Sequence, residues 1–119
     1  MVCGKERINL KLSITAFKVA GPRFYPYKSA ALQIGDQLKL QAEPDNPYDP
    51  NAIAVLKSDI KIGHVPKTQT HEYHPHLSNP ELEVIIIALD LQAKYPIIIA
   101  QGIYEPLGER KEDSATPPQ

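Results

Sequence analysis

The sequence predicts a mainly β protein in which about six strands, with one or two short helices, form a small closed or nearly closed barrel. Several segments alternate apolar and polar residues with the two-residue period of a half-buried strand, and clusters of turn-forming residues separate them. Twelve prolines argue against a mainly helical chain. With 119 residues, the chain is long enough for one domain with a substantial core but not for two.

The first strand is expected in the segment Ile8 to Ala16, where an apolar residue stands at every second position. The apolar phase then slips to Phe17 and Val19, which indicates a bulge or sharp bend in a long, curved strand. A Gly-Pro pair follows and ends this strand.

The next strands are expected in DQLKLQAE, NAIAVLK and DIKIGHV, which repeat the alternation. The last two are so close that Ala52 to Val65 is predicted to form a hairpin. The β-branched runs ELEVIIIALDL and YPIIIAQGIY are long enough for strands buried on both faces. Helical turns are expected in KSAALQIGD, capped by Gly35, and in PKTQTHEYHPHL, which Pro66 begins and Pro75 shortens.

The domain organisation predicted from these elements is a lead-in at 1–7, a single folded domain at 8–107 and a disordered tail at 108–119, rich in charge and proline. Cys3 is the only cysteine, which excludes an internal disulfide or a multi-cysteine zinc site and fits a reducing compartment. The sequence shows neither a signal-peptide apolar region nor a membrane span, so a cytoplasmic location is expected.

The net charge of −1 gives no overall attraction to nucleic acid. The charges are unevenly distributed, however. Residues 1–67 carry ten Lys and Arg against six Asp and Glu, a net +4, whereas residues 68–119 carry three against eight, a net −5. The first part of the chain could therefore present a local positive surface that the total conceals.

No enzyme motif is present: the chain has no G-x-S-x-G, no glycine-rich phosphate loop and no Cys-His signature. Three histidines in HEYHPH, His71, His74 and His76, stand close together and near His64, but a solvent-facing polar helix end explains them better than zinc. The stretch DNPYDPN resembles a calcium loop, yet Pro47 occupies the third position and no glycine occupies the sixth. We therefore expect a protein that is not an enzyme and has no cofactor or metal.

Residues 21–28, GPRFYPYK, alternate cations and aromatic rings. Such a combination holds single-stranded nucleic acid, because bases stack on the rings while the cations follow the phosphates. The alternative is structural: Phe24 or Tyr25 plugs the end of the barrel, and Arg23 pairs with an acid.

Three segments together, VAGPRFYP, GDQLKLQAEPDNPYDPNAIAVL and KIGHVPK, resemble the successive signatures of the HIRAN domain family over about residues 12–105. The resemblance implies a modified OB-like barrel without catalytic activity, found at the N-terminus of helicase-like transcription factor and as free-standing small proteins. It further implies recognition of the 3′-hydroxyl end of single-stranded DNA in a DNA repair or replication-fork context. A separately encoded helicase, nuclease or other repair enzyme is the implied partner.

The resemblance also implies which residues contact DNA. They are Arg23, Phe24, Tyr25, Asp45, Asn46, Tyr48, Asp49, His64, Lys67 and Tyr95. Within this set, Tyr48 and Phe24 would stack on the two faces of the terminal base, and Asp49 would accept a hydrogen bond from the 3′-hydroxyl. Phe24 stands where the best-known member has a tyrosine, and Tyr95 is assigned by a loose alignment.

The remaining members of this set would serve the base, the sugar and the phosphates. Asn46 and Asp45 would contact base or sugar edges, while Arg23 and Lys67 would hold the nearest phosphates. His64 would either add a contact or pack beneath these residues.

Two readings compete with end recognition. Asp49 could merely cap the turn through backbone amides. The barrel could also be a protein-interaction or adaptor module that uses the isoleucine-rich region 84–99. A zinc-dependent nuclease built from His64, His71, His74 and Asp49 is a remote third reading, since it would require bound metal.

Overall fold

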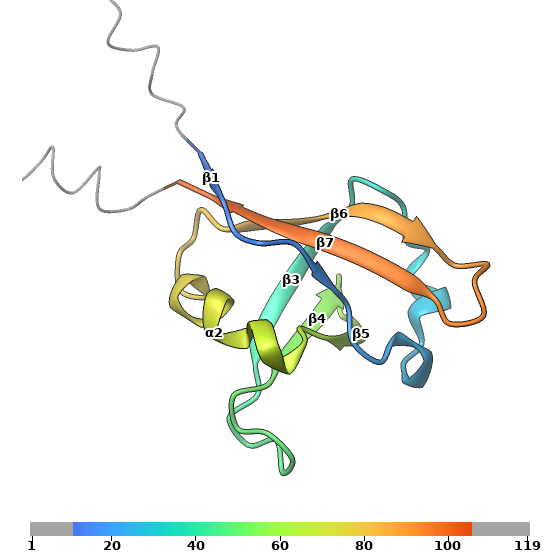
Figure 1. The fold of residues 1–119 in the computed structure, drawn as a ribbon, viewed down its shortest axis with the longest axis horizontal. Helices are drawn as coiled ribbons and strands as arrows, with labels where there is room; N and C mark the ends of the chain where they lie inside the picture. The colour runs from blue at the N-terminus through green and yellow to red at the C-terminus, as the bar shows by residue number, and fades with distance from the viewer. Residues whose placement is uncertain (1–10, 106–119) are drawn as a thin grey trace, which may run out of the picture.

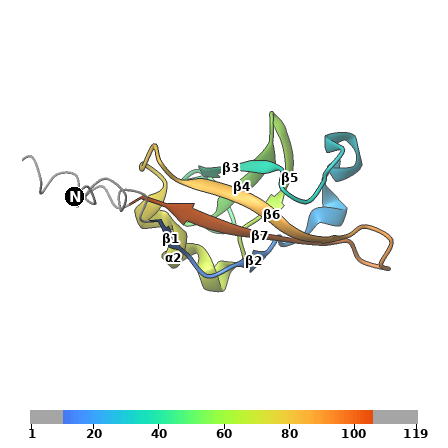
Figure 2. The same cartoon turned by 90° about the horizontal axis from the view of Figure 1, so that it is seen from above.

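The computed structural model describes residues 11–105, which form one curled antiparallel sheet with short helical turns beside it (Figures 1 and 2). The strands are β1 (Leu12–Ser13), β2 (Phe17–Lys18), β3 (Gln37–Ala42), β4 (Ile53–Lys57), β5 (Ile60–His64), β6 (Glu83–Asp90) and β7 (Ile97–Tyr104). Among the described residues, the helical elements are the 3-10 helices η2 (Pro22–Phe24), η3 (Tyr27–Ala30), η4 (Lys67–Gln69) and η5 (His74–His76) and the α-helix α2 (Thr70–Tyr73).

The strand order is β1-β7-β6-β3-β4-β5, and β2 also pairs with β7. The sheet curls at β3, whose Gln37 and Leu38 pair with β6 while its remaining residues pair with β4. Beyond β2, Ala20 and His64 exchange two backbone hydrogen bonds of 2.7 and 3.1 Å, which bring β5 back to the start of the chain. The sheet is thus nearly closed, and the prediction of a mainly β, OB-like barrel is confirmed.

The first predicted strand, Ile8 to Ala16, begins outside the described residues, and from residue 11 onwards the prediction of a continuous strand is wrong. Two short strands, β1 and β2, pair in turn with β7, and the chain bends between them. Leu12, predicted on the inner face, is 42% exposed, whereas Ile14 is buried. The bend predicted from the shift of apolar phase is present, and it lets Phe17 and Val19 enter the core.

The predicted β4–β5 hairpin is confirmed; its strands pair in antiparallel register with an irregularity after Val55. The prediction that the two isoleucine-rich runs are buried on both faces is wrong. In β6 and β7, Val84, Ile86, Ile98 and Ala100 are buried, but Ile87 is 43% exposed on the opposite face. Because no second layer covers that face in the described residues, the strands alternate like those of a one-sided sheet.

The helical turns differ in detail from the expectations. The first, η3, ends at Ala30 and is followed by the cap residue Ala31 in a left-handed conformation (φ 50°), and Gly35 lies in a later turn. The second region begins directly after Pro66, and the α-helix within it is four residues long. Pro75 follows in η5, as the predicted shortening requires.

The helical region is joined to the sheet by Tyr73, which is fully buried. Its hydroxyl donates to the Thr15 carbonyl at 2.7 Å and accepts from the Gly102 amide at 3.1 Å, while its ring meets Phe17 edge-on. A Cβ on Gly102 would come within 2.8 Å of the Tyr73 ring. The glycine is therefore needed for this close approach, which places α2 against β7.

The predicted lead-in at 1–7 and tail at 108–119 lie outside the described residues. Within residues 11–105, no helix has the length and apolar character needed to cross a bilayer.

Candidate nucleic-acid interface

The loop between β3 and β4, residues 43–51, projects from the body of the sheet (Figure 1) and is shaped by its own side chains. Asn46 Oδ1 accepts hydrogen bonds from the amides of Tyr48 at 2.8 Å and Asp49 at 3.1 Å. Asp49 Oδ1 accepts from the Asn51 amide at 2.9 Å. The capping role considered for Asp49 is therefore present, and the Tyr48 side chain is left 91% exposed.

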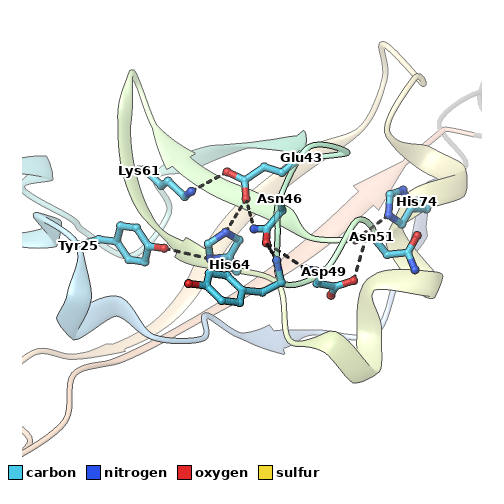
Figure 3. A network of polar contacts seen from close by, with 9 residues as sticks. Tyr25, Glu43, Asn46, Asp49, Asn51, Lys61, His64 and His74 are labelled. Carbon is cyan, nitrogen blue, oxygen red and sulfur yellow. Dashed lines mark hydrogen bonds and ion pairs between the residues drawn. The ribbon is translucent and has the colours of Figure 1, made fainter.

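Glu43, the first residue after β3, is the centre of the polar contacts around this loop (Figure 3). Its Oε1 accepts from Asn46 Nδ2 at 3.1 Å and lies 2.8 Å from His64 Nε2. Its Oε2 accepts from Lys61 Nζ at 2.6 Å. The carboxylate thus joins the loop to two residues of β5.

The charge of Glu43 is strongly favoured in this position. Burial alone would raise the pKa of its carboxyl group, but hydrogen bonds from Lys61, His64 and Asn46 together outweigh that effect and lower the pKa to about 2. The side chain is 23% exposed, so these hydrogen bonds act in a partly desolvated setting. Glu43 is therefore a carboxylate at every physiological pH.

Glu43 and Lys61 were missed from the sequence. They are 18 positions apart, and Glu43 and His64 are 21 apart, so no short motif connects them. The available signal was the hairpin itself: Ala42 pairs with Ile53, and Ala54 pairs with His64. That register brings the residue after β3 towards the end of β5, but it is visible only once the strands are paired.

A second group of predicted residues gathers where the chain leaves β2. Gly21, in a left-handed conformation (φ 65°), turns the chain into η2. The Arg23 guanidinium lies 4.7 Å from the Phe24 ring centroid and 4.9 Å from that of Tyr95. Lys94 Nζ lies 5.5 Å from the Tyr95 ring centroid. The loosely assigned Tyr95 is thus brought to the segment that carries Arg23 and Phe24.

An open pocket of about 520 Å³ lies beside this group. Its walls come from residues 18–24, Pro66 and residues 95–96, so three distant segments form it. The Phe24 ring is 72% exposed and therefore does not plug the barrel. Among the described residues, Arg23 has ring contacts but no ion pair, which differs from the structural alternative considered for it.

Tyr25 connects the two groups, because its hydroxyl is 3.5 Å from His64 Nδ1 and its ring meets the imidazole edge-on. Lys61 Nζ lies 5.2 Å from the Tyr25 ring centroid. Lys67 is exposed in η4, and Asp45 is exposed in the loop. Apart from Lys67, the predicted residues therefore fall into a polar loop and an aromatic cluster, joined through Tyr25 and His64.

The histidines of HEYHPH have separate contacts. His74 Nε2 lies 2.9 Å from the Asn51 carbonyl oxygen, and His76 packs on Tyr104 with 4.3 Å between ring centroids, while His71 is exposed. In residues 11–105, no three His, Cys, Asp or Glu side chains converge as a metal site would require. His74 instead links the end of α2 to the loop.

Comparison with known proteins identifies relatives of this fold. A crystal structure of a protein from Lactobacillus plantarum is 25% identical, with a TM-score of 0.63, and the match covers 81% of this chain and 98% of that one. The crystal structure of the HIRAN domain of human HLTF is 21% identical, with a TM-score of 0.64 and coverages of 83% and 84%.

An NMR structure of the HLTF HIRAN domain in its DNA-bound conformation is 20% identical, with a TM-score of 0.59 and coverages of 94% and 91%. The comparison with curated proteins gives no match. The sequence model of the HIRAN domain, however, matches residues 13–94, well over half of the chain. The chain therefore belongs to the HIRAN domain family.

Proposed function

We propose that this protein is a non-catalytic DNA-binding module that holds the 3′-hydroxyl end of single-stranded DNA in a DNA repair or replication-fork context. One observation carries the proposal. Within residues 11–105, the exposed large apolar side chains are Leu12, Phe24, Ile34, Tyr48, Ile87 and Tyr95. All three aromatic rings among them belong to the loop and cluster described above, where exposed rings can stack on bases.

The family supports a DNA ligand. The HLTF HIRAN domain has been determined in a DNA-bound conformation, and its fold is shared by this chain. The polar loop and the aromatic cluster also offer the two kinds of contact that single-stranded DNA requires, namely rings for bases and cations for phosphates. A separately encoded helicase, nuclease or other repair enzyme would supply the chemistry.

In the proposed complex, Tyr48 and Phe24 stack on the terminal base, each stack being worth about 1–3 kcal/mol. Arg23 and Lys67 hold the nearest phosphates. Asp49 Oδ1 caps the Asn51 amide, and we assign the second oxygen, Oδ2, to the terminal hydroxyl. A carboxylate in this place accepts a hydrogen bond from a hydroxyl and repels a terminal phosphate.

The two neighbouring side chains of the loop have different assignments. Both ends of the Asn46 amide are engaged within the loop, so we assign Asn46 to shaping it. Asp45, which is exposed, is assigned to a base or sugar edge. Tyr95 extends the stacking surface on the far side of Arg23, and Tyr25 supports His64.

The test is fluorescence anisotropy with labelled ten-nucleotide strands that differ only in a 3′-hydroxyl or a 3′-phosphate, at low and physiological salt. We expect tighter binding of the hydroxyl end. Asp49→Asn keeps an oxygen that caps Asn51 but removes the charge, so the melting temperature should hold while the preference for the hydroxyl end falls about tenfold. An unchanged preference would assign Asp49 to capping alone.

Equal binding of both ends, or no binding, would contradict end recognition. Binding of neither strand would favour the adaptor reading, for which the exposed face of β6 and β7 around Ile87 is the available surface. A mass that rises with concentration, measured by light scattering, would separate self-association of that face from a monomer awaiting a different partner.

A further inference from the structure

Glu43 joins the polar loop to β5, and we refer to this set of contacts as the Glu43 junction. Glu43 follows the last residue of β3, and its two carboxylate oxygens contact Asn46 in the loop and Lys61 and His64 in β5 (Figure 3). A carboxylate offers about four acceptor positions, and three of them are used here by different segments. Glu43 has neither an aromatic ring that could stack on a base nor a positive charge that could hold a phosphate. We therefore assign it no direct contact with DNA.

The contact with Asn46 fixes the direction of that side chain. Since a carboxylate accepts but cannot donate, the amide must turn its Nδ2 towards Glu43 Oε1. Its Oδ1 is then left to accept from the Tyr48 and Asp49 amides at 2.8 and 3.1 Å. Glu43 thereby fixes, through Asn46, the backbone positions of Tyr48 and Asp49, which carry the proposed stacking ring and the proposed hydroxyl acceptor.

The contact with His64 fixes a second group. For the same reason, the ring nitrogen that faces Glu43, Nε2, must carry a proton. The other nitrogen, Nδ1, faces the Tyr25 hydroxyl at 3.5 Å, and Tyr25 belongs to the segment that continues from Arg23 and Phe24. Contacts that start from one carboxylate therefore reach both the loop and, through His64 and Tyr25, the segment that carries Arg23 and Phe24.

Lys61 balances the charge of this junction. Its ammonium group contacts Glu43 Oε2 and lies near the Tyr25 ring. A lone carboxylate next to the site would repel an approaching DNA strand, and the adjacent cation offsets that repulsion. The lowered pKa of Glu43 agrees with a carboxylate that stays charged.

We propose that Glu43 is the positioning residue of the DNA-end site, which orients Asn46 and His64 so that the loop and the aromatic segment act on one chain end. This inference rests on the proposed function. It adds that end selectivity depends on a residue that does not touch DNA.

The test compares Glu43→Gln with Glu83→Gln, a matched change at an exposed residue of β6. Glutamine keeps the shape of Glu43 but places an NH₂ group among the donors of Lys61, His64 and Asn46. We expect the hydroxyl-over-phosphate preference to fall at least fivefold in Glu43→Gln and to stay unchanged in Glu83→Gln. A purely stabilising role would weaken both ends equally and leave the ratio intact.

The free protein gives a second readout. In ¹⁵N NMR spectra, wild type should show His64 protonated at Nε2, and Glu43→Gln should alter both this pattern and the Tyr48 and Asp49 amide signals. If Glu43→Gln fails to fold, Glu43→Asp, which keeps the charge but withdraws the carboxylate by one methylene, should show the same losses to a smaller extent.

The outcomes distinguish this inference from the proposed function. A wild type that does not distinguish the two ends overturns the proposed function. A selective wild type whose Glu43 variants keep the full ratio, or whose His64, Tyr48 and Asp49 signals stay in place, overturns the positioning role alone.

Discussion

The polar loop at residues 43–51 and the aromatic cluster of Arg23, Phe24 and Tyr95 are stabilised in different ways. In the loop, side chains and amides are joined by hydrogen bonds of 2.6–3.1 Å that extend to β5. In the cluster, a guanidinium group lies near two largely exposed rings. Directional bonds define one geometry, whereas ring contacts tolerate small shifts. In the proposed complex, the loop would therefore select the chain end, and the cluster would stack on any base.

The largest expected effect comes from disrupting the close approach of β5 to the segment that leads from β2 to Arg23. Gly63 precedes His64 and adopts φ 151°, and a Cβ there would lie 2.5 Å from Val19 Cγ1 and 2.7 Å from the Ala20 carbonyl oxygen. Gly63→Ala should therefore push β5 away from the segment that leads to Arg23. We expect a loss of about 3 kcal/mol in the free energy of unfolding, measured by urea denaturation.

The matched control for that substitution is Gly35→Ala. Gly35 also has a positive φ of 96°, but a Cβ there would meet nothing within 4 Å. It should cost about 1 kcal/mol, because backbone strain is present without a clash. Equal losses in the two variants would mean that the close approach of β5 to Ala20 contributes little.

A smaller effect should appear on acidification, through the carboxylate of Glu43 in the polar loop. The folded-state pKa of Glu43, about 2, lies below its ordinary value of 4.5, so the carboxylate stabilises the fold above pH 4.5, and this contribution disappears as the pH falls through 2. Wild type should be about 2 kcal/mol more stable than Glu43→Gln at pH 7, and the gap should close between pH 4.5 and 2.

Urea denaturation of both proteins across this pH range measures the gap. The contacts of the aromatic cluster have no carboxylate and should not contribute to it. A gap that stays constant with pH would show that Glu43 acts through its shape rather than its charge.

Sequence reasoning succeeded where a local pattern carried the information. The β4–β5 hairpin, the bend before Phe17 and the helix shortened by Pro75 all follow from residues close together in the chain. The capping of the turn by Asp49, considered as the alternative to end recognition, likewise involves residues only two positions apart. These features depend on interactions over a few positions, which one sequence displays directly.

The errors and omissions arose where the outcome depends on pairing between distant segments. Whether Ile87 is covered depends on a second layer, and the sequence of a strand does not say whether one exists. The role of Glu43 depends on the register of three strands, and that of Tyr95 on the loop that follows β6. Only the fold brings these residues to the site.

The smallest expected effect tests how the aromatic cluster holds its cation. Arg23→Lys keeps the positive charge but loses the planar group that lies near the Phe24 and Tyr95 rings. Affinity for a ten-nucleotide strand, measured by anisotropy, should fall about threefold, with the salt dependence unchanged. Arg23→Ala should weaken binding further and reduce the slope of log affinity against log salt by about one.

These two variants separate the contributions of charge and shape in the cluster. If Arg23→Lys binds as weakly as Arg23→Ala, the planar guanidinium group matters more than its charge. The cluster would then depend on a defined geometry between Arg23 and the two rings. If Arg23→Lys binds like wild type, Arg23 acts as a simple phosphate contact. An affinity of Arg23→Lys between those of wild type and Arg23→Ala would mean that the aromatic cluster contributes affinity through several weak contacts. The selection of the chain end would then depend on the hydrogen-bonded loop.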